Sequence, residues 1–254
     1  MKLKKTPFIL LTCITLLFLI YTSAWFGGAK LLENAVTQTL QGQSASGKRL
    51  FDGKVSKVNG YPGAYRLEAQ GRVITPNFLL KFPEAIIKGW PIPGTAITAD
   101  FQKGLQIILP GQVVETFDNA LLEFTMSPHY PKNINNYELM RWYQAQGNIH
   151  IKRLTLVQQD IRFDLSGDIS LDEDLQPIAQ LTLALTGKDK VIEKLVKRDI
   201  LTEEQASLVG QLASKLASEN TDTEGEITAK MVVQNNAIYY GPLRIMSLPE
   251  AKWE

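Results

Sequence analysis

The chain has 254 residues, of which 44% are hydrophobic and 21% are charged, proportions typical of a globular protein rather than a disordered chain or a coiled coil. Its net charge of +1 argues against nucleic-acid binding, which requires a strong positive excess. One cysteine, Cys13, and two histidines, His129 and His150, exclude a disulfide framework and argue against a Cys/His zinc cluster.

An uncharged, strongly apolar segment over residues 7–26 predicts a transmembrane helix. A helix of about 20 residues spans roughly 30 Å, the hydrocarbon thickness of a bilayer. Lysines at positions 2, 4 and 5 precede the segment, and such residues stay on the cytoplasmic side. Tyr21, Trp25 and Phe26 suit the opposite interface, where aromatic rings are enriched.

This orientation divides the chain into three parts. We expect residues 1–6 to form a cytoplasmic tail, residues 7–26 to span the membrane, and residues 27–254 to form a single β-rich domain outside the cytoplasm. If the cell is Gram-negative, the membrane is the inner membrane and the domain lies in the periplasm. A cleaved signal peptide is the alternative, with Thr22-Ser23-Ala24 as a cleavage site. The anchor is favoured because the apolar stretch continues through Trp25 and Phe26, beyond the usual length of a signal peptide core.

Period-two alternation is the dominant pattern of the body. After a Gly27-Gly28 hinge and an amphipathic helix over residues 29–42, alternating apolar and polar residues predict a strand over 65–73. The clearest strand covers residues 161–171, and its neighbours are close enough to pair with it through short turns. We therefore expect an antiparallel meander, whose other strands are residues 148–157 and 178–186.

Prolines and helical spacing mark the remaining segments. Four prolines between residues 83 and 118 predict short strands at sheet edges. Residues 127–137 read as a loop that leads into a helical turn over 137–145. Apolar residues at helical spacing predict a short helix around 191–196, and a Thr202/Gln205 capping box begins a second helix that runs to about residue 218.

The chain then returns to strands at 227–233 and 237–240, joined by a tight Asn235-Asn236 turn. The predicted fold class is α+β: a transmembrane helix followed by a curved, mostly antiparallel sheet with the two helices of 188–218 packed on one face. Strands in which apolar and polar residues alternate regularly have one face exposed to solvent. The sheet is therefore covered on one side only, or it curls round its apolar side.

Motifs that would indicate catalysis or cofactor binding are incomplete. Residues 42–49 match a nucleotide-binding P-loop up to Lys48, but Arg49 stands where Ser or Thr must hold magnesium. A turn is the simpler interpretation, and no nucleotide is expected. Asp172-Glu173-Asp174 lacks the glycine of a calcium loop and reads as a solvated turn. We expect no enzyme activity, no metal and no cofactor.

Two tryptophans and the apolar side of the second predicted helix are the candidates for a hydrophobic binding groove. Trp90 stands between Gly89 and Pro91, and Trp142 follows the loop of 127–137. Aromatic side chains at such positions line a groove or pack at an edge. The second predicted helix carries an apolar stripe that must also be buried, and its candidate residues are Val209, Leu212 and Leu216.

Short motifs scattered along nearly the whole chain form a set. They are Trp25 just past the anchor, Gly47 after a helix, Val58-Asn59-Gly60-Tyr61-Pro62 before a strand, the run from Asn236 to Leu243, and Leu248-Pro249. Together they resemble the uncharacterised proteobacterial envelope family catalogued as domain of unknown function 2125. Asn236 departs from the pattern, because it stands where the turn more often has Gly.

The resemblance implies an inner-membrane anchor, a periplasmic β-rich body and no assigned activity. A looser similarity, at the level of the fold, is to AsmA-like envelope proteins, whose long curved sheets are associated with lipid handling. Two hypotheses follow for this chain. It binds a lipid or other hydrophobic ligand in the concavity of the sheet, or it is an adaptor that engages another envelope protein through an exposed sheet edge.

Overall fold

The computed structural model describes most of the chain, and all structural statements below concern the described part. It covers residues 6–41, 51–74, 78–90, 92, 94–109, 113–128, 131, 135–198, 202–220, 226–248, 250–251 and 253. The P-loop-like segment of residues 42–49 and His129 lie outside it.

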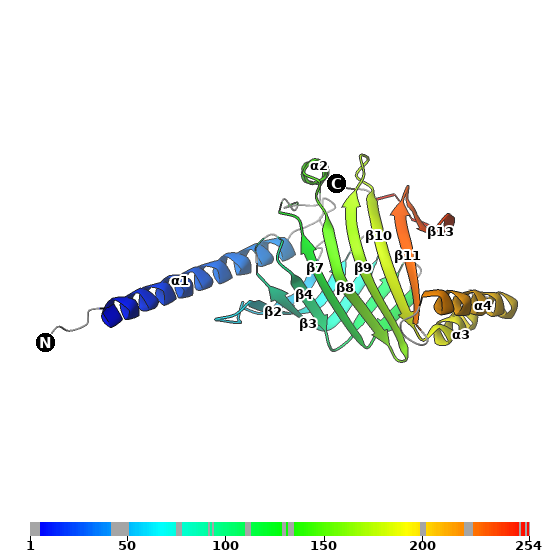
Figure 1. Ribbon diagram of the computed structural model, residues 1–254, viewed down its shortest axis with the longest axis horizontal. Helices are drawn as coiled ribbons and strands as arrows, with labels where there is room; N and C mark the ends of the chain where they lie inside the picture. Colours follow the sequence, from blue (N-terminus) through cyan, green and yellow to red (C-terminus); the bar gives the residue numbers. More distant parts are fainter. Residues whose placement is uncertain are drawn as a thin grey trace.

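The described part of the chain folds into one antiparallel sheet and four helices (Figure 1), which confirms the predicted α+β class. The helices are α1 (Thr6–Gln41), α2 (Asn136–Gln144), α3 (Lys188–Lys197) and α4 (Glu203–Asn220). The strands are β1 (Phe51–Val55), β2 (Tyr65–Ile74), β3 (Leu79–Gly89), β4 (Ile97–Phe101), β5 (Leu105–Leu109), β6 (Val113–Phe117), β7 (Asn119–Met126), β8 (Ile149–Gln158), β9 (Ile161–Leu171), β10 (Pro177–Thr186), β11 (Glu226–Gln234), β12 (Ala237–Tyr240) and β13 (Leu243–Ser247).

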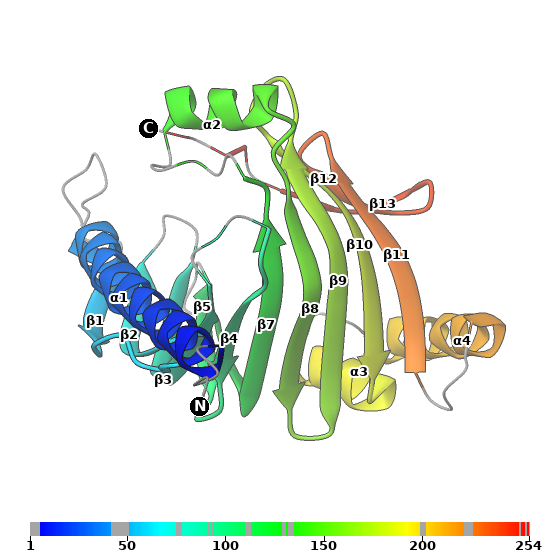
Figure 2. The same ribbon diagram turned by 60° about the vertical axis from the view of Figure 1, so that its left-hand side comes forward.

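The sheet is an open, curved path rather than a closed barrel. Its order is β1-β2-β3-β4-β7-β8-β9-β10-β11-β12-β13, and β5 and β6 branch from β3. Figure 2 shows the long strands β7 to β11 bending together, with β1 to β6 on the inner side of the bend. The predicted meander is confirmed as β8, β9 and β10, and β9 covers the predicted residues 161–171.

Two short-range signals are confirmed by the geometry that they predict. Asn235 and Asn236 both have positive φ, 50° and 52°, as the tight turn between β11 and β12 requires. The capping box at the start of α4 is reciprocal. The Gln205 amide donates to Thr202 Oγ1 at 3.2 Å, and the Thr202 amide donates to Gln205 Oε1 at 3.0 Å, which satisfies two free amides of the first turn.

The expected hinge at Gly27-Gly28 is wrong, because α1 runs without a break from Thr6 to Gln41. Gly28 serves close packing instead. A Cβ at this position would lie 2.2 Å from the hydroxyl of Tyr65 on β2, so a larger residue would require the buried Tyr65 side chain to shift. The predicted membrane segment and the predicted amphipathic helix therefore form one continuous helix.

The expectation of edge strands around Pro83 is also wrong for β3, which lies inside the sheet between β2 and its partners β4 and β5. Pro83 is accommodated because the pairing of β2 with β3 shifts register between Ala69 and Gly71. On the other side of β3, the pairs with β5 end at Lys81 and the pairs with β4 begin at Ile86. The missing amide therefore breaks no ladder hydrogen bond.

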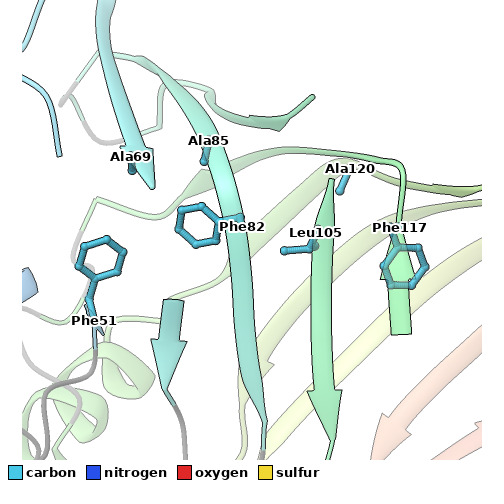
Figure 3. Close-up of a cluster of buried hydrophobic side chains, with 7 residues drawn as sticks. All are labelled: Phe51, Ala69, Phe82, Ala85, Leu105, Phe117 and Ala120. Carbon is cyan, nitrogen blue, oxygen red and sulfur yellow. The ribbon is translucent and has the colours of Figure 1, made fainter. Parts of the chain in front are cut away.

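The main core is formed by buried side chains from β1, β2, β3, β5, β6 and β7 (Figure 3). Phe82 is 7% exposed, and its ring centroid lies 5.4 Å from that of Phe101 and 6.4 Å from that of Phe51. Leu156 on β8 and Phe163 on β9 pack against this cluster. The other buried members are Ala69, Ala85, Leu105, Phe117 and Ala120.

Helix α3 is held to β6 by one carboxylate. Lys194 Nζ donates to Glu115 Oε2 at 2.5 Å, and Arg198 donates to Glu115 Oε1. Burial alone would raise the pKa of Glu115, but the hydrogen bonds from Arg198 and Lys194 outweigh it, so the pKa lies below its ordinary value of 4.5. The ion pairs therefore stabilise the attachment of α3 only while Glu115 is ionised.

Replacing Glu115 by glutamine is expected to lower the free energy of unfolding by about 1–2 kcal/mol at neutral pH, a value reduced by the partial exposure of both cations. Because the folded pKa is lowered, this stabilisation is complete above 4.5 and is lost as the pH falls through the folded value. Denaturant unfolding at several pH values measures the difference. Glu193→Gln on the exposed side of α3 is the control, and an equal effect from both variants would contradict this role.

Candidate functional site

The central strands carry a continuous apolar surface, which we call the apolar face. Alternation along each strand places every second side chain on one side of the sheet, and the registers align these side chains across four or five strands. One row is Leu154, Leu165, Leu183 and Ala229; the next is Ile151, Gly167, Leu181, Met231 and Tyr240; the third is Ile149, Ile169, Ala179, Val233 and Ile238.

Most of this surface is only half-buried. Leu165, Leu183 and Met231, in the middle of the rows, all keep part of their side chains exposed. The central strands of a sheet of this size normally bury such residues under a helix or a second sheet. The apolar face therefore has the composition of a core and the exposure of a surface.

Both ends of the apolar face are covered. At one end Leu156 and Phe163 continue into the main core. At the other end Leu171 is buried with Leu139 and Trp142 of α2, and Trp253 packs against them. Between these two clusters, Leu165, Leu183 and Met231 of the middle rows are only half-buried.

The opposite face of the same strands is mostly polar. Arg162 Nε donates to Asp164 Oδ2 at 2.5 Å, and Thr155 also donates to Asp164. These hydrogen bonds, from Arg162 above all, lower the pKa of Asp164 despite its partial burial. His150 Nδ1 lies 2.9 Å from Asp168 Oδ1. This face is suited to water, so the two sides of β8 to β11 differ sharply.

Trp90, Trp142 and Val209, the predicted groove residues whose side chains are described, lie in three separate places. Trp90 lies at the end of β3, 5.3 Å between ring centroids from Tyr65. Trp142 is 5% exposed in the α2 cluster, where its Nε1 donates to Ser127 Oγ at 3.0 Å. Val209 is 38% exposed on α4, and the side chains of Leu212 and Leu216 lie outside the described part of the chain.

The site residues that sequence reasoning missed are those of the apolar face. Their signal was present in the alternation of 161–171 and 178–186, which correctly predicted strands. What alternation cannot show is whether another element covers the apolar side. That property depends on the placement of β1 to β6 and α2, which are distant in the sequence.

A separate surface cavity of about 740 Å³ lies between β1, β2, β3, β5 and β6. Its lining includes four basic side chains, two of which are paired with carboxylates: Arg72 lies 2.8 Å from Asp52, and Lys103 contacts Glu84. The other two are Lys54 and Lys81. The charged rim distinguishes this cavity from the apolar face.

The sequence motifs dismissed above behave as turns where the structure describes them. Asp172 Oδ1 accepts hydrogen bonds from the amides of Asp174 and Gln176, at 3.0 and 2.7 Å. The carboxylate therefore closes the turn between β9 and β10. Among the described residues, no group of three or more His, Cys, Asp or Glu side chains could hold a metal ion.

Helix α1 projects away from the sheet (Figure 1). Between Ile14 and Asn34 it is long and apolar enough to cross a membrane, and 12% of that stretch is buried in the body. Large apolar side chains from Ile14 to Ile20 are 55–65% exposed. Exposed apolar surfaces of this kind are typical of contact sites with a membrane or with another protein.

Comparison with known proteins places the chain in a family. No curated protein and no solved structure matches it. Residues 95–249, more than half of the chain, match the model of a family described as uncharacterized proteins conserved in bacteria, DUF2125. This match covers β4 to β13 and thus every strand of the apolar face. The chain belongs to the DUF2125 family.

Proposed function

We propose that this protein is a non-enzymatic envelope protein, anchored in the inner membrane by α1, that binds a lipid or other hydrophobic ligand on the apolar face. The observation that carries the proposal is the half-buried state of Leu165, Leu183 and Met231 in the middle of a large sheet. Ligand sites are lined mostly by hydrophobic side chains, and this partly exposed surface between two covered ends has that composition.

The free energy gained when an acyl chain covers this surface is large enough for binding. Each buried methylene contributes about 0.8 kcal/mol, so a chain of about ten methylenes gains roughly 8 kcal/mol before the cost of association. Apart from Tyr240, the side chains in the rows of the apolar face carry no hydrogen-bonding group. They therefore favour a ligand selected by length and shape rather than by polar groups.

The anchor supports a location at the membrane. Lysines at positions 2, 4 and 5 keep the N-terminus in the cytoplasm, so the body lies in the periplasm. Tyr21 and Thr22, on the N-terminal side of the possible cleavage site, contact Pro62 and Tyr61 of the body. Since cleavage after Ala24 would remove both contacts, they favour a retained anchor. The protein is thus expected to resist carbonate extraction.

A pair of variants on adjacent residues of β10 tests lipid binding. Leu183 lies on the apolar face between Leu165 and Ala229, whereas Thr182 lies on the polar face between Ser166 and Lys230. Leu183→Gln is expected to reduce the amount of lipid that co-purifies with the full chain, and Thr182→Gln to leave it unchanged. Native mass spectrometry after detergent extraction measures the bound lipid.

The pair of variants distinguishes lipid bound on the apolar face from lipid that adheres to α1. Lipid that adheres to α1 is retained equally by both variants, because neither change touches that helix. Equal lipid content in the wild type, Leu183→Gln and Thr182→Gln would contradict binding on the apolar face. Unfolding midpoints of the two variants show whether any loss reflects the site or the fold.

An adaptor function is the second candidate, and the open sheet favours it. Among the described strands, β13 pairs with β12 alone, and Leu243 on it is 62% exposed. An edge strand of this kind can accept a strand from a partner. Stoichiometric co-purification of another envelope protein that is lost on Leu243→Pro, with no bound lipid, would favour the adaptor over the groove.

A further inference from the structure

The membrane helix is fixed to the body by a compact aromatic cluster. Trp25 is 3% exposed, and its ring centroid lies 5.0 Å from that of Tyr65 and 5.4 Å from that of Tyr61. Phe26 stacks on Tyr61 at 5.4 Å. Together with Tyr21 and Trp90, which contact Tyr61 and Tyr65, these residues form what we call the aromatic collar.

Hydrogen bonds fix the position along α1 at which the helix contacts the body. Trp25 Nε1 donates to the carbonyl of Gly63 at 2.8 Å, and the Tyr65 hydroxyl donates to the carbonyl of Trp25 at 3.1 Å. Thr22 Oγ1 lies 2.7 Å from the Tyr61 hydroxyl. The loop between β1 and β2 thus lies alongside α1 from Tyr21 to Phe26.

The length of α1 forces this loop toward the bilayer. Only Thr6 to Ile20 of the helix lie on the N-terminal side of the collar, a length of about 22 Å at 1.5 Å per residue. The hydrocarbon core of a bilayer is about 30 Å thick. Charged residues do not enter it cheaply, so the lysine at position 5 marks the other end of the span. The span must therefore extend to about Trp25.

The exposed groups of the collar suit this position. Phe26 is 57% exposed and Tyr21 is 40% exposed, although both lie beside the folded body. Pro62, Gly63 and Ala64 at the tip of the loop are exposed and carry no charge. Aromatic rings with a polar edge are the residues that favour the region between hydrocarbon and water.

We infer that the aromatic collar and the β1–β2 loop form a membrane-docking surface, seated in the periplasmic interface of the phospholipid bilayer. The inference rests on α1 spanning the membrane, as proposed above, and adds that the body lies directly on the bilayer. Trp25 fixes the body to the helix, and the loop tip contacts the lipid. The protein is therefore held at one height and one angle rather than on a flexible tether.

Spin labels at three positions test this arrangement in the full chain. In a Cys13→Ser background, Leu17→Cys reports on α1, Ala64→Cys on the loop tip, and Ser207→Cys on α4, at the opposite end of the molecule from α1 (Figure 1). All three positions are exposed, so a label at any of them displaces no core residue. The protein is reconstituted in vesicles of phosphatidylethanolamine and phosphatidylglycerol.

The measurement compares collisions with oxygen, which concentrates in lipid, and with a water-soluble nickel chelate. We expect the oxygen-to-nickel ratio to be highest at Leu17, several-fold lower at Ala64, and lowest at Ser207. Equal ratios at Ala64 and Ser207, with a high ratio at Leu17, would overturn docking and leave the anchor intact. A ratio at Leu17 as low as that at Ser207 would instead contradict the membrane span itself.

Discussion

Replacing Gly167 by alanine is expected to destabilise the fold by about 2–5 kcal/mol, the sum of backbone strain and overpacking. Gly167 lies in the middle of β9, between Ile151 and Leu181, and has a φ of +140°. A Cβ would lie 2.0 Å from the carbonyl oxygen of Gln180 and 2.9 Å from the Cα of Leu181. Both atoms belong to the backbone of β10, which cannot move without breaking the ladder.

Denaturant unfolding of the full chain in detergent measures this effect. Ser166→Ala is the matched control, because it changes the adjacent half-buried residue of the same strand and is expected to shift stability by less than about 0.5 kcal/mol. A Gly167→Ala variant as stable as Ser166→Ala would show that the approach of β9 and β10 is not as close as described.

Phe82→Ala is expected to cost about 3–5 kcal/mol, the usual range for removing a buried aromatic ring and leaving a cavity. The ring lies in the main core (Figure 3), where it contacts the rings of Phe51 and Phe101. Since Leu156 and Phe163 pack on the same cluster, the loss is expected to loosen the covered end of the apolar face as well.

Near-ultraviolet circular dichroism during unfolding follows this core. Tyr137→Ala is the control, because Tyr137 is 71% exposed on α2 and its loss is expected to change stability by less than about 0.5 kcal/mol. Equal midpoints for the two variants would contradict the placement of Phe82 in the core.

Local patterns in the sequence predicted the elements better than their arrangement. The alternation of 161–171, the capping box of Thr202 and Gln205, and the Asn235-Asn236 turn are each specified by neighbouring residues, and all three are confirmed. The glycine pair in α1 and Pro83 in β3 were misread. In both cases a contact with a distant strand, rather than the local preference of the residue, decides the conformation.

For the candidate site too, the sequence predicted local features but not their arrangement in space. Trp90 and Trp142 were chosen as conspicuous single residues, and each proves to be packed in its own cluster. The apolar face depends on the registers of β8 to β12 and on the absence of a cover over their middle rows in the described part of the chain. Alternation predicts which residues share a face, but only the tertiary structure shows how exposed that face is.

Photo-cross-linking in intact membranes is the most direct test of lipid binding on the apolar face. A phosphatidylglycerol with a diazirine in its acyl chain is incorporated into cells that express the full chain, and labelled residues are mapped by peptide mass spectrometry. We expect adducts on α1 and also on apolar-face residues of β9, β10 and β11, such as Leu165, Leu183 and Met231, with none on polar-face residues of the same strands, such as Thr182. Adducts confined to α1 and the loop between β1 and β2 would contradict lipid binding by the sheet.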